Sequence, residues 1–103
     1  MDMQRILQQA RKMQKEMEKK QAALEETLFE ITSTGGPIKV SIYGNYHIEK
    51  VKIDKDMIDP EDKEMLEDSI SIAINEAIEK VQAEQAKITN SMTVNAGFGG
   101  FGF

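Results

Sequence analysis

The stretch "IKVSIYGNYHIEKVKID", Ile38–Asp54, decides the fold because apolar and polar residues alternate on both sides of a Gly-Asn pair. Before that pair, the apolar positions are Ile38, Val40 and Ile42. A period of two is typical of a strand with one buried face, and Gly44-Asn45 suits a tight hairpin turn. The stretch therefore predicts two antiparallel strands joined by a short turn.

The second half of this stretch is less regular than the first. Val51 and Ile53 alternate with lysines, but Ile48 is out of phase with both. This predicts a bulge near Glu49, or a start to the strand that is not regularly paired. Upstream, "LFEITST" alternates in the same way, and "GGP" separates it from the central strand. We expect a three-stranded antiparallel meander with one apolar face.

The residues before the sheet predict a long helix from about Asp2 to Glu26. They are rich in Gln, Lys, Glu, Met and Ala, which are good helix formers. Apolar residues recur with heptad-like spacing at Met3, Ile6, Ala10, Met13, Met17 and Leu24. Lys20 occupies the position where this apolar seam is interrupted. The seam is typical of a helix that packs against another helix.

A second helix is expected after the sheet, beginning in "DPEDKEMLEDSI". Asp59 is a suitable N-cap and Pro60 a suitable first helical residue. Apolar residues continue the helical pattern to about Ile88, at Leu66, Ile70, Ala73, Ile74, Ala77, Ile78 and Val81. The sequence thus predicts a single α+β domain over residues 1–88, with a flexible Gly- and Phe-rich tail over residues 89–103.

Charge is distributed unevenly along the chain. The 103 residues carry a formal net charge of −5, yet six cations and only three acids fall within the first twenty residues. These cations are Arg5, Arg11, Lys12, Lys15, Lys19 and Lys20. Arg5, Lys12 and Lys19 are seven residues apart and form one row on a helix, with Arg11 and Lys15 in a second. Such rows suit contact with phosphates, although cations on a helix flank are commonly just solvated.

Other patterns argue against an enzyme, a cofactor or a metal site. The chain has no Cys and one His, His47, which lacks the partners of a catalytic triad. A G-x-G-x-x-G pattern begins at Gly97, but no helix can follow it before the chain stops. Asp54 and Asp56 lack the remaining ligands of a calcium loop. With no signal peptide and no membrane span, we expect a cytoplasmic protein with no membrane partner and no small-molecule substrate.

The order of these segments resembles the YbaB/EbfC family of nucleoid-associated DNA-binding proteins. The resemblance covers nearly the whole chain, from "QQARKMQKEMEKKQAALEE" to the Gly/Phe-rich end. Its most specific parts are V-x-I-x-G at Val40–Gly44, V-x-I-D at Val51–Asp54 and D-x-E-M-L-E-D at Asp62–Asp68. The resemblance implies an α-β-β-β-α order and a tweezer-like homodimer with projecting helices.

It also implies a function, namely binding of double-stranded DNA in the bacterial nucleoid with little sequence preference, to organise the chromosome or modulate expression. The six N-terminal cations are then the candidate DNA-binding residues. An alternative from a different class is a coiled-coil interaction protein or a prefoldin-like holdase chaperone, because Met-rich seams suit adaptable apolar contacts.

Overall fold

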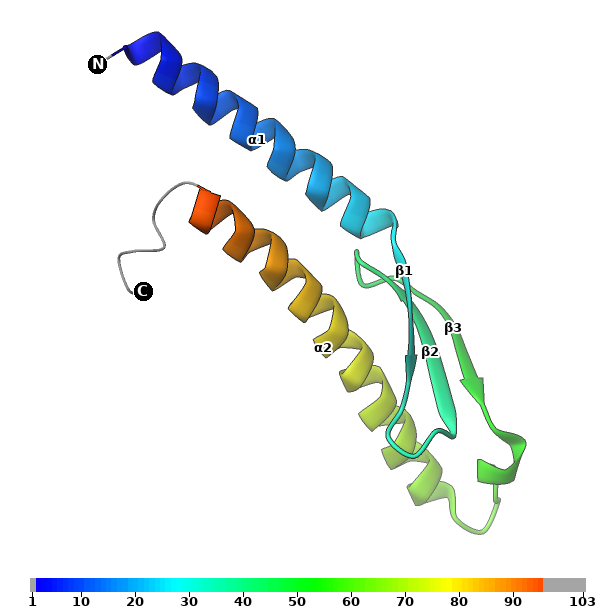
Figure 1. The fold of residues 1–103 in the computed structure, drawn as a ribbon. Coiled ribbons are helices and arrows are strands. Elements are labelled where there is room, and N and C mark those ends of the chain that lie inside the picture. The colour runs from blue at the N-terminus through cyan, green and yellow to red at the C-terminus, as the bar shows by residue number, and fades with distance from the viewer. Residues whose placement is uncertain (1, 96–103) are drawn as a thin grey trace.

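The protein, described over residues 2–95 by a computed structural model, has two long helices and one three-stranded antiparallel sheet (Figure 1). The elements are α1 (Met3–Glu26), β1 (Leu28–Thr32), β2 (Ile38–Tyr43), β3 (Ile48–Ile53), a short 3₁₀ helix (Lys55–Met57) and α2 (Lys63–Asn95). The predicted α+β class and element order are confirmed. Most of the predicted tail, residues 96–103, lies outside the described part.

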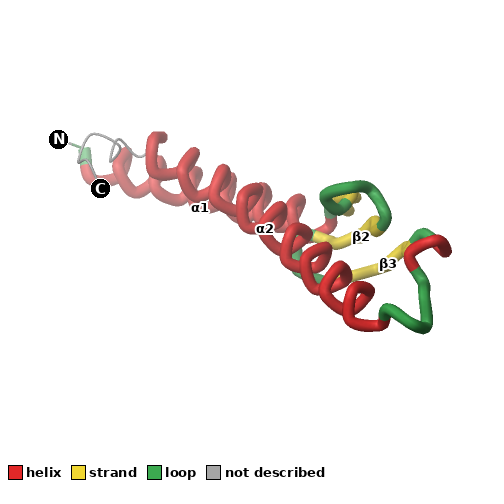
Figure 2. Tube along the Cα trace, turned by 90° about the horizontal axis from the view of Figure 1, so that it is seen from below, coloured by secondary structure: helices red, strands yellow, loops and turns green. Residues whose placement is uncertain are grey.

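The molecule is elongated. Its principal extents are 71 × 28 × 15 Å and its radius of gyration is 19.7 Å, whereas a compact chain of this length would have a radius of gyration of about 13 Å. α1 and the sheet follow one another end to end, and α2 runs back alongside both (Figures 1 and 2). One layer therefore holds α1 and the sheet, and the other holds α2.

The strands pair in sequence order, with β2 in the centre. β1 pairs with β2 without interruption. Between β2 and β3 the register shifts, because Ser41 pairs with Lys50 while Ile42 pairs with Ile48. Glu49 is the extra residue, so the predicted bulge is confirmed.

A small core forms where β2 meets α2. Its fully or almost fully buried members are Ile38, Val40, Ile42, Ala73, Ala77 and Val81. The β2 members are branched, and two of the three α2 members are alanines, so the helix can approach the sheet closely. Complete burial of each large apolar side chain contributes roughly 1.5–3 kcal/mol, which makes this layer the main source of stability.

The edges of the sheet are covered less well. Phe29 and Ile31 from β1, and Ile48 and Ile53 from β3, are partly buried against the core. Val51 pairs with buried Val40 and so shares its face, yet 37% of Val51 is exposed. α2 therefore leaves part of the apolar face along β3 open to solvent.

The start of α2 differs from the sequence prediction. Asp59 does not cap it; the Asp59 carboxylate accepts a hydrogen bond from the Glu61 N–H at 2.9 Å, within a single turn closed by the Asp62 N–H. α2 begins at Lys63, and the Asp62 carboxylate accepts from the Met65 N–H at 3.4 Å. The prediction was wrong because Pro after Asp suits a turn as well as a first helical residue.

The end of α2 also differs. The helix continues to Asn95 instead of ending near Ile88, so residues 89–95 are helical and not part of a tail. Nothing between these two points breaks a helix, since the next Gly is Gly97.

The β2–β3 turn brings the sheet against the end of α1. Its left-handed residue is Tyr46, at φ 71°, and Gly44 does not need positive φ. Gly44 is required instead for proximity, because a Cβ there would lie 1.9 Å from the Leu24 carbonyl oxygen. The Gly44 N–H donates to the Thr27 carbonyl at 3.1 Å. This contact fixes the end of α1 on the sheet.

We expect Gly44→Ala to destabilise the fold by about 2 kcal/mol or more, because the new methyl group must displace backbone. Urea unfolding followed by circular dichroism measures the change. Tyr46→Asn is the control in the same turn and should stay within about 0.5 kcal/mol, since Asn tolerates positive φ. Equal stability of the two variants would contradict the contact described here.

Candidate nucleic-acid interface

α1 is an arm attached at one end. Asp2 caps its start by accepting a hydrogen bond from the Gln4 N–H at 3.0 Å. Near the sheet, the side-chain amides of Gln21 and Gln85 exchange two hydrogen bonds of 2.8 Å, which join α1 to α2. Leu24 is buried at the same end. These contacts hold the last two turns of α1.

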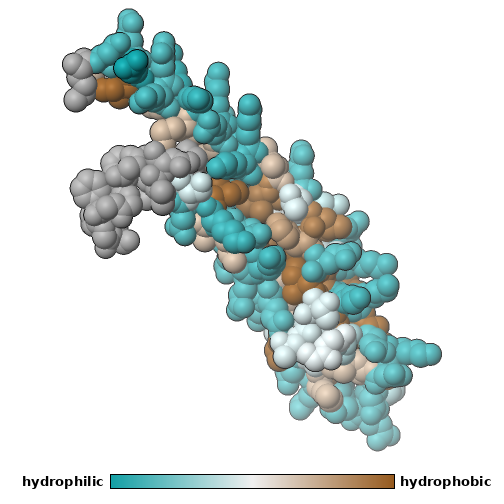
Figure 3. Space-filling model, in the orientation of Figure 1, coloured by the Kyte–Doolittle hydropathy of each residue, from teal (hydrophilic) through white to brown (hydrophobic). Residues whose placement is uncertain are grey.

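The predicted apolar seam is only partly covered within one chain. Leu24 is buried and Met13 half-buried, but Met3, Ile6 and Met17 are 73%, 44% and 38% exposed. Hydrophilic residues cover most of the face in Figure 3, with hydrophobic patches between them. The free part of α1 thus presents apolar side chains that α2 does not cover.

The cations of α1 gather on the side opposite this seam. Arg11, Lys12, Lys15 and Lys19 line one shallow depression together with Gln8 and Glu16. With 3.6 residues per turn, these four cations and Arg5 fall within an arc of roughly 120°, centred about 180° from the seam. We call Arg5, Arg11, Lys12, Lys15 and Lys19 the cationic side of α1.

Lys20 is not part of this group. Its Nζ donates a hydrogen bond of 3.4 Å to the Ser91 hydroxyl of α2. The structure therefore brings together five of the six candidate residues and turns the sixth toward the other helix.

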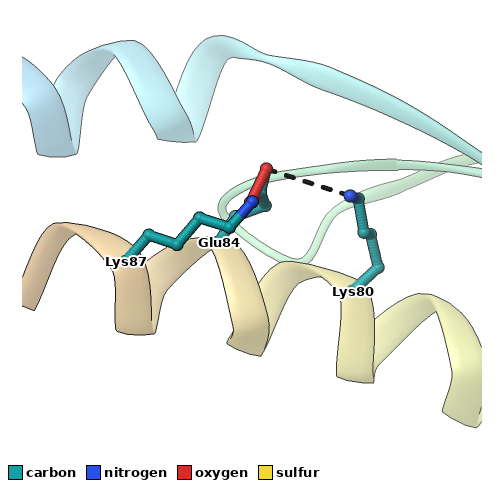
Figure 4. Close-up of polar contacts among 3 residues, drawn as sticks. All are labelled: Lys80, Glu84 and Lys87. Carbon is teal, nitrogen blue, oxygen red and sulfur yellow. Dashed lines mark ion pairs between the residues drawn. The ribbon is translucent and has the colours of Figure 1, made fainter. Parts of the chain in front are cut away.

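The two helices differ in how their cations are neutralised. On α2, Lys80 and Lys87 lie 3.9 and 2.7 Å from the Glu84 carboxylate (Figure 4). Within residues 2–95, no cation of α1 forms an ion pair, although Glu16, Glu18 and Glu26 lie on the same helix. The charge of α1 is consequently available to an external anion.

Glu84 has an unusual environment for an acid. Its side chain is 20% exposed, and it lies beside Phe29 and Leu24 in a cleft between the two helices. The hydrogen bond from Lys87 lowers the pKa of Glu84 below its ordinary value, against an opposing effect of burial, and the charge of Lys80 lowers the pKa further.

The sheet holds cations that the charge count along the chain does not reveal. Lys39, Lys50 and Lys52 share the face turned away from α2, since Lys39 pairs with Lys52 and Ser41 with Lys50. The same alternation that predicts the strands also predicts that the polar positions between the apolar ones share the opposite face. Grouping those positions would have identified the three lysines.

The structure also places the other features that the sequence pointed out. The His47 ring lies 6.1 Å from the Tyr43 ring, at the turn. Residues 2–95 contain no group of three or more His, Cys, Asp or Glu placed to hold a metal ion. Over the same range, neither helix is long and apolar enough to cross a bilayer.

Comparison with known proteins yields a family and several relatives. Residues 1–97 match the sequence model of the YbaB/EbfC DNA-binding family. A nucleoid-associated protein of Malacoplasma penetrans is 51% identical over 89 residues, covering 86% of this chain and 94% of the relative. One from Ureaplasma urealyticum is 41% identical over 101 residues, covering 98% and 100%.

A solved structure has the same fold. The crystal structure of an uncharacterized protein from Helicobacter pylori superposes with a TM-score of 0.70 at 24% identity. The match covers 89% of this chain and 97% of that one.

The ion pairs of Glu84 with Lys80 and Lys87 predict that the stability of the fold depends on pH. Because the pKa of Glu84 is lowered on folding, its contribution to stability is present above the unfolded-state pKa and disappears as the pH falls through the lower folded-state value. Glu84→Gln should melt below the wild type at pH 7, and the gap should narrow below about pH 4.5. Thermal melts between pH 3 and pH 7 measure this, and a gap independent of pH would contradict the charge interaction.

Proposed function

Because the chain belongs to the YbaB/EbfC DNA-binding family, we propose that it binds duplex DNA through the cationic side of α1, with low sequence specificity, and helps organise the chromosome or modulate expression. One observation carries the proposal. Five cations without an acidic partner in the described residues share one arc of a projecting helix.

Phosphate contact explains why this arrangement would serve DNA. Lys and Arg that neutralise phosphates release condensed counterions, and this term does not depend on sequence. Contacts to phosphate position a protein without reading the bases. The remainder of the chain is acidic in net charge, so α1 would be the segment that attracts the duplex most strongly.

We infer further that the active form is a homodimer. The exposed parts of the seam, Met3, Ile6 and Met17, and the open edge at Val51 are more apolar surface than one small chain usually leaves uncovered. A second copy would cover such surface and supply a second arm. Two arms bind one duplex more tightly than either would alone.

The exposed methionines also support a second candidate, a holdase that captures apolar segments. The two functions respond differently to salt. Phosphate contacts weaken steeply as salt rises, whereas apolar capture does not.

Neutralising the cationic side of α1 should weaken DNA binding. We expect Lys12→Gln/Lys19→Gln to lower affinity for unrelated duplexes alike, with helicity retained because Gln is also a good helix former. The wild-type slope of log affinity against log salt should be roughly −4 to −7 if about five to eight of the ten cations in a dimer engage. Mobility shifts or fluorescence anisotropy across a salt series measure both quantities.

The matched control is Lys55→Gln/Lys63→Gln, which removes the same charge from a segment rich in acids. It should leave affinity and slope close to those of the wild type. A control that loses as much affinity as the α1 variant would show that net charge alone matters. A wild-type affinity that does not fall as salt rises would favour the holdase.

The dimer is tested by light scattering. We expect the mass of two 11.6 kDa chains at micromolar concentration. A mass of one chain that does not change on further concentration would contradict the dimer.

A further inference from the structure

The face of the sheet that is turned away from α2 gathers three of the seven cations that follow Gln21 in the chain. The β2–β3 register places Lys39 directly opposite Lys52, and Lys50 opposite Ser41. All three lysines are exposed. Together with Glu30 and half-buried Ser41 they line one depression. We call this depression the sheet cluster.

The sheet cluster costs the fold stability. Like charges directly opposite one another in a sheet repel, and none of the three lysines forms an ion pair anywhere in residues 2–95. Lysines on an edge strand discourage pairing with other sheets, which accounts for Lys50 and Lys52 on β3. It does not account for Lys39, which lies on the central strand.

We propose that the sheet cluster is a second contact surface for the phosphate backbone of duplex DNA, and this rests on the DNA binding proposed above for α1. Both surfaces face the same way. The cationic side of α1 lies opposite its α2-facing seam, and the sheet cluster lies opposite the face that α2 covers. A duplex lying along the layer of α1 and the sheet would contact both.

The shape of the cluster favours an extended polyanion over a small one. The three lysines of the cluster are exposed on the sheet face turned away from α2, whereas sites for small anions usually enclose their ligand. Cβ atoms of directly opposed residues lie about 5 Å apart, and residues two apart on a strand are separated by about 6.7 Å. Three flexible ammonium groups over such distances suit successive phosphates.

The test compares Lys39→Gln/Lys52→Gln with the control Lys55→Gln/Lys63→Gln in the full chain. We expect the sheet variant to bind any duplex about tenfold more weakly near 0.1 M salt, with a slope shallower by roughly 0.9 for each phosphate that is no longer neutralised. Because a like-charge pair is removed, its melting temperature should stay the same or rise. Lys39→Arg/Lys52→Arg keeps the charge and should retain wild-type affinity.

A second measurement needs no substitution. The wild-type protein is acetylated with and without saturating DNA, and lysine modification is read by mass spectrometry. DNA should protect Lys39, Lys50 and Lys52 but leave Lys55 and Lys63 reactive. Equal reactivity of the sheet cluster in both samples would overturn the proposal, even if a variant failed to fold.

The outcomes separate the two proposals. If the wild type binds DNA and the sheet variant binds as tightly as the control variant, the proposal for the sheet cluster is overturned and α1 remains the interface. A wild type that binds no duplex would remove both. Weaker binding by the sheet variant, with its melting temperature maintained and the Arg variant unaffected, would support the second surface.

Discussion

The structure depends on the contact between the branched residues of β2 and two alanines and a valine of α2. Ile38, Val40 and Ile42 are fully buried against Ala73, Ala77 and Val81, and the other hydrophobic residues packed on this core are only partly buried. Because this layer is narrow, it can hold one helix on one sheet face. It leaves the other face, the β3 edge and most of α1 in solvent. The exposed cationic and apolar surfaces are therefore consequences of how small the core is.

Much of the fold could be predicted from sequence because period-two and heptad-like patterns are long and regular here. Even the bulge at Glu49 followed from the phase of Ile48. The start of α2 could not be predicted, since Asp59 and Asp62 are both good caps, and only backbone hydrogen bonds decide between them. The end of α2 was missed because β-branched and polar residues weaken a helix without ending it.

The candidate site was predictable in part. Spacing along one helix places five cations on one side and puts Lys20 on the side of the apolar seam, but it does not show what Lys20 contacts there. That contact needs the position of Ser91, seventy-one residues away in the chain. Similarly, the neutralisation of Lys80 and Lys87 depends on where the Glu84 carboxylate lies between them. Charge counts describe a segment, whereas a binding surface is defined by which charges remain unpaired after folding.

The Gly44–Leu24 contact is the point about which α1 would rotate relative to the sheet. The backbone of Gly44 lies directly against the backbone of Leu24, so neither segment can move there without moving the other. The arm beyond it is long: 24 residues at 1.5 Å each reach about 36 Å. A rotation of 10° at the pivot would then move the tip by roughly 6 Å, about the rise of one helical turn. A small change in backbone position at Gly44 would consequently be amplified into a large displacement at the start of α1.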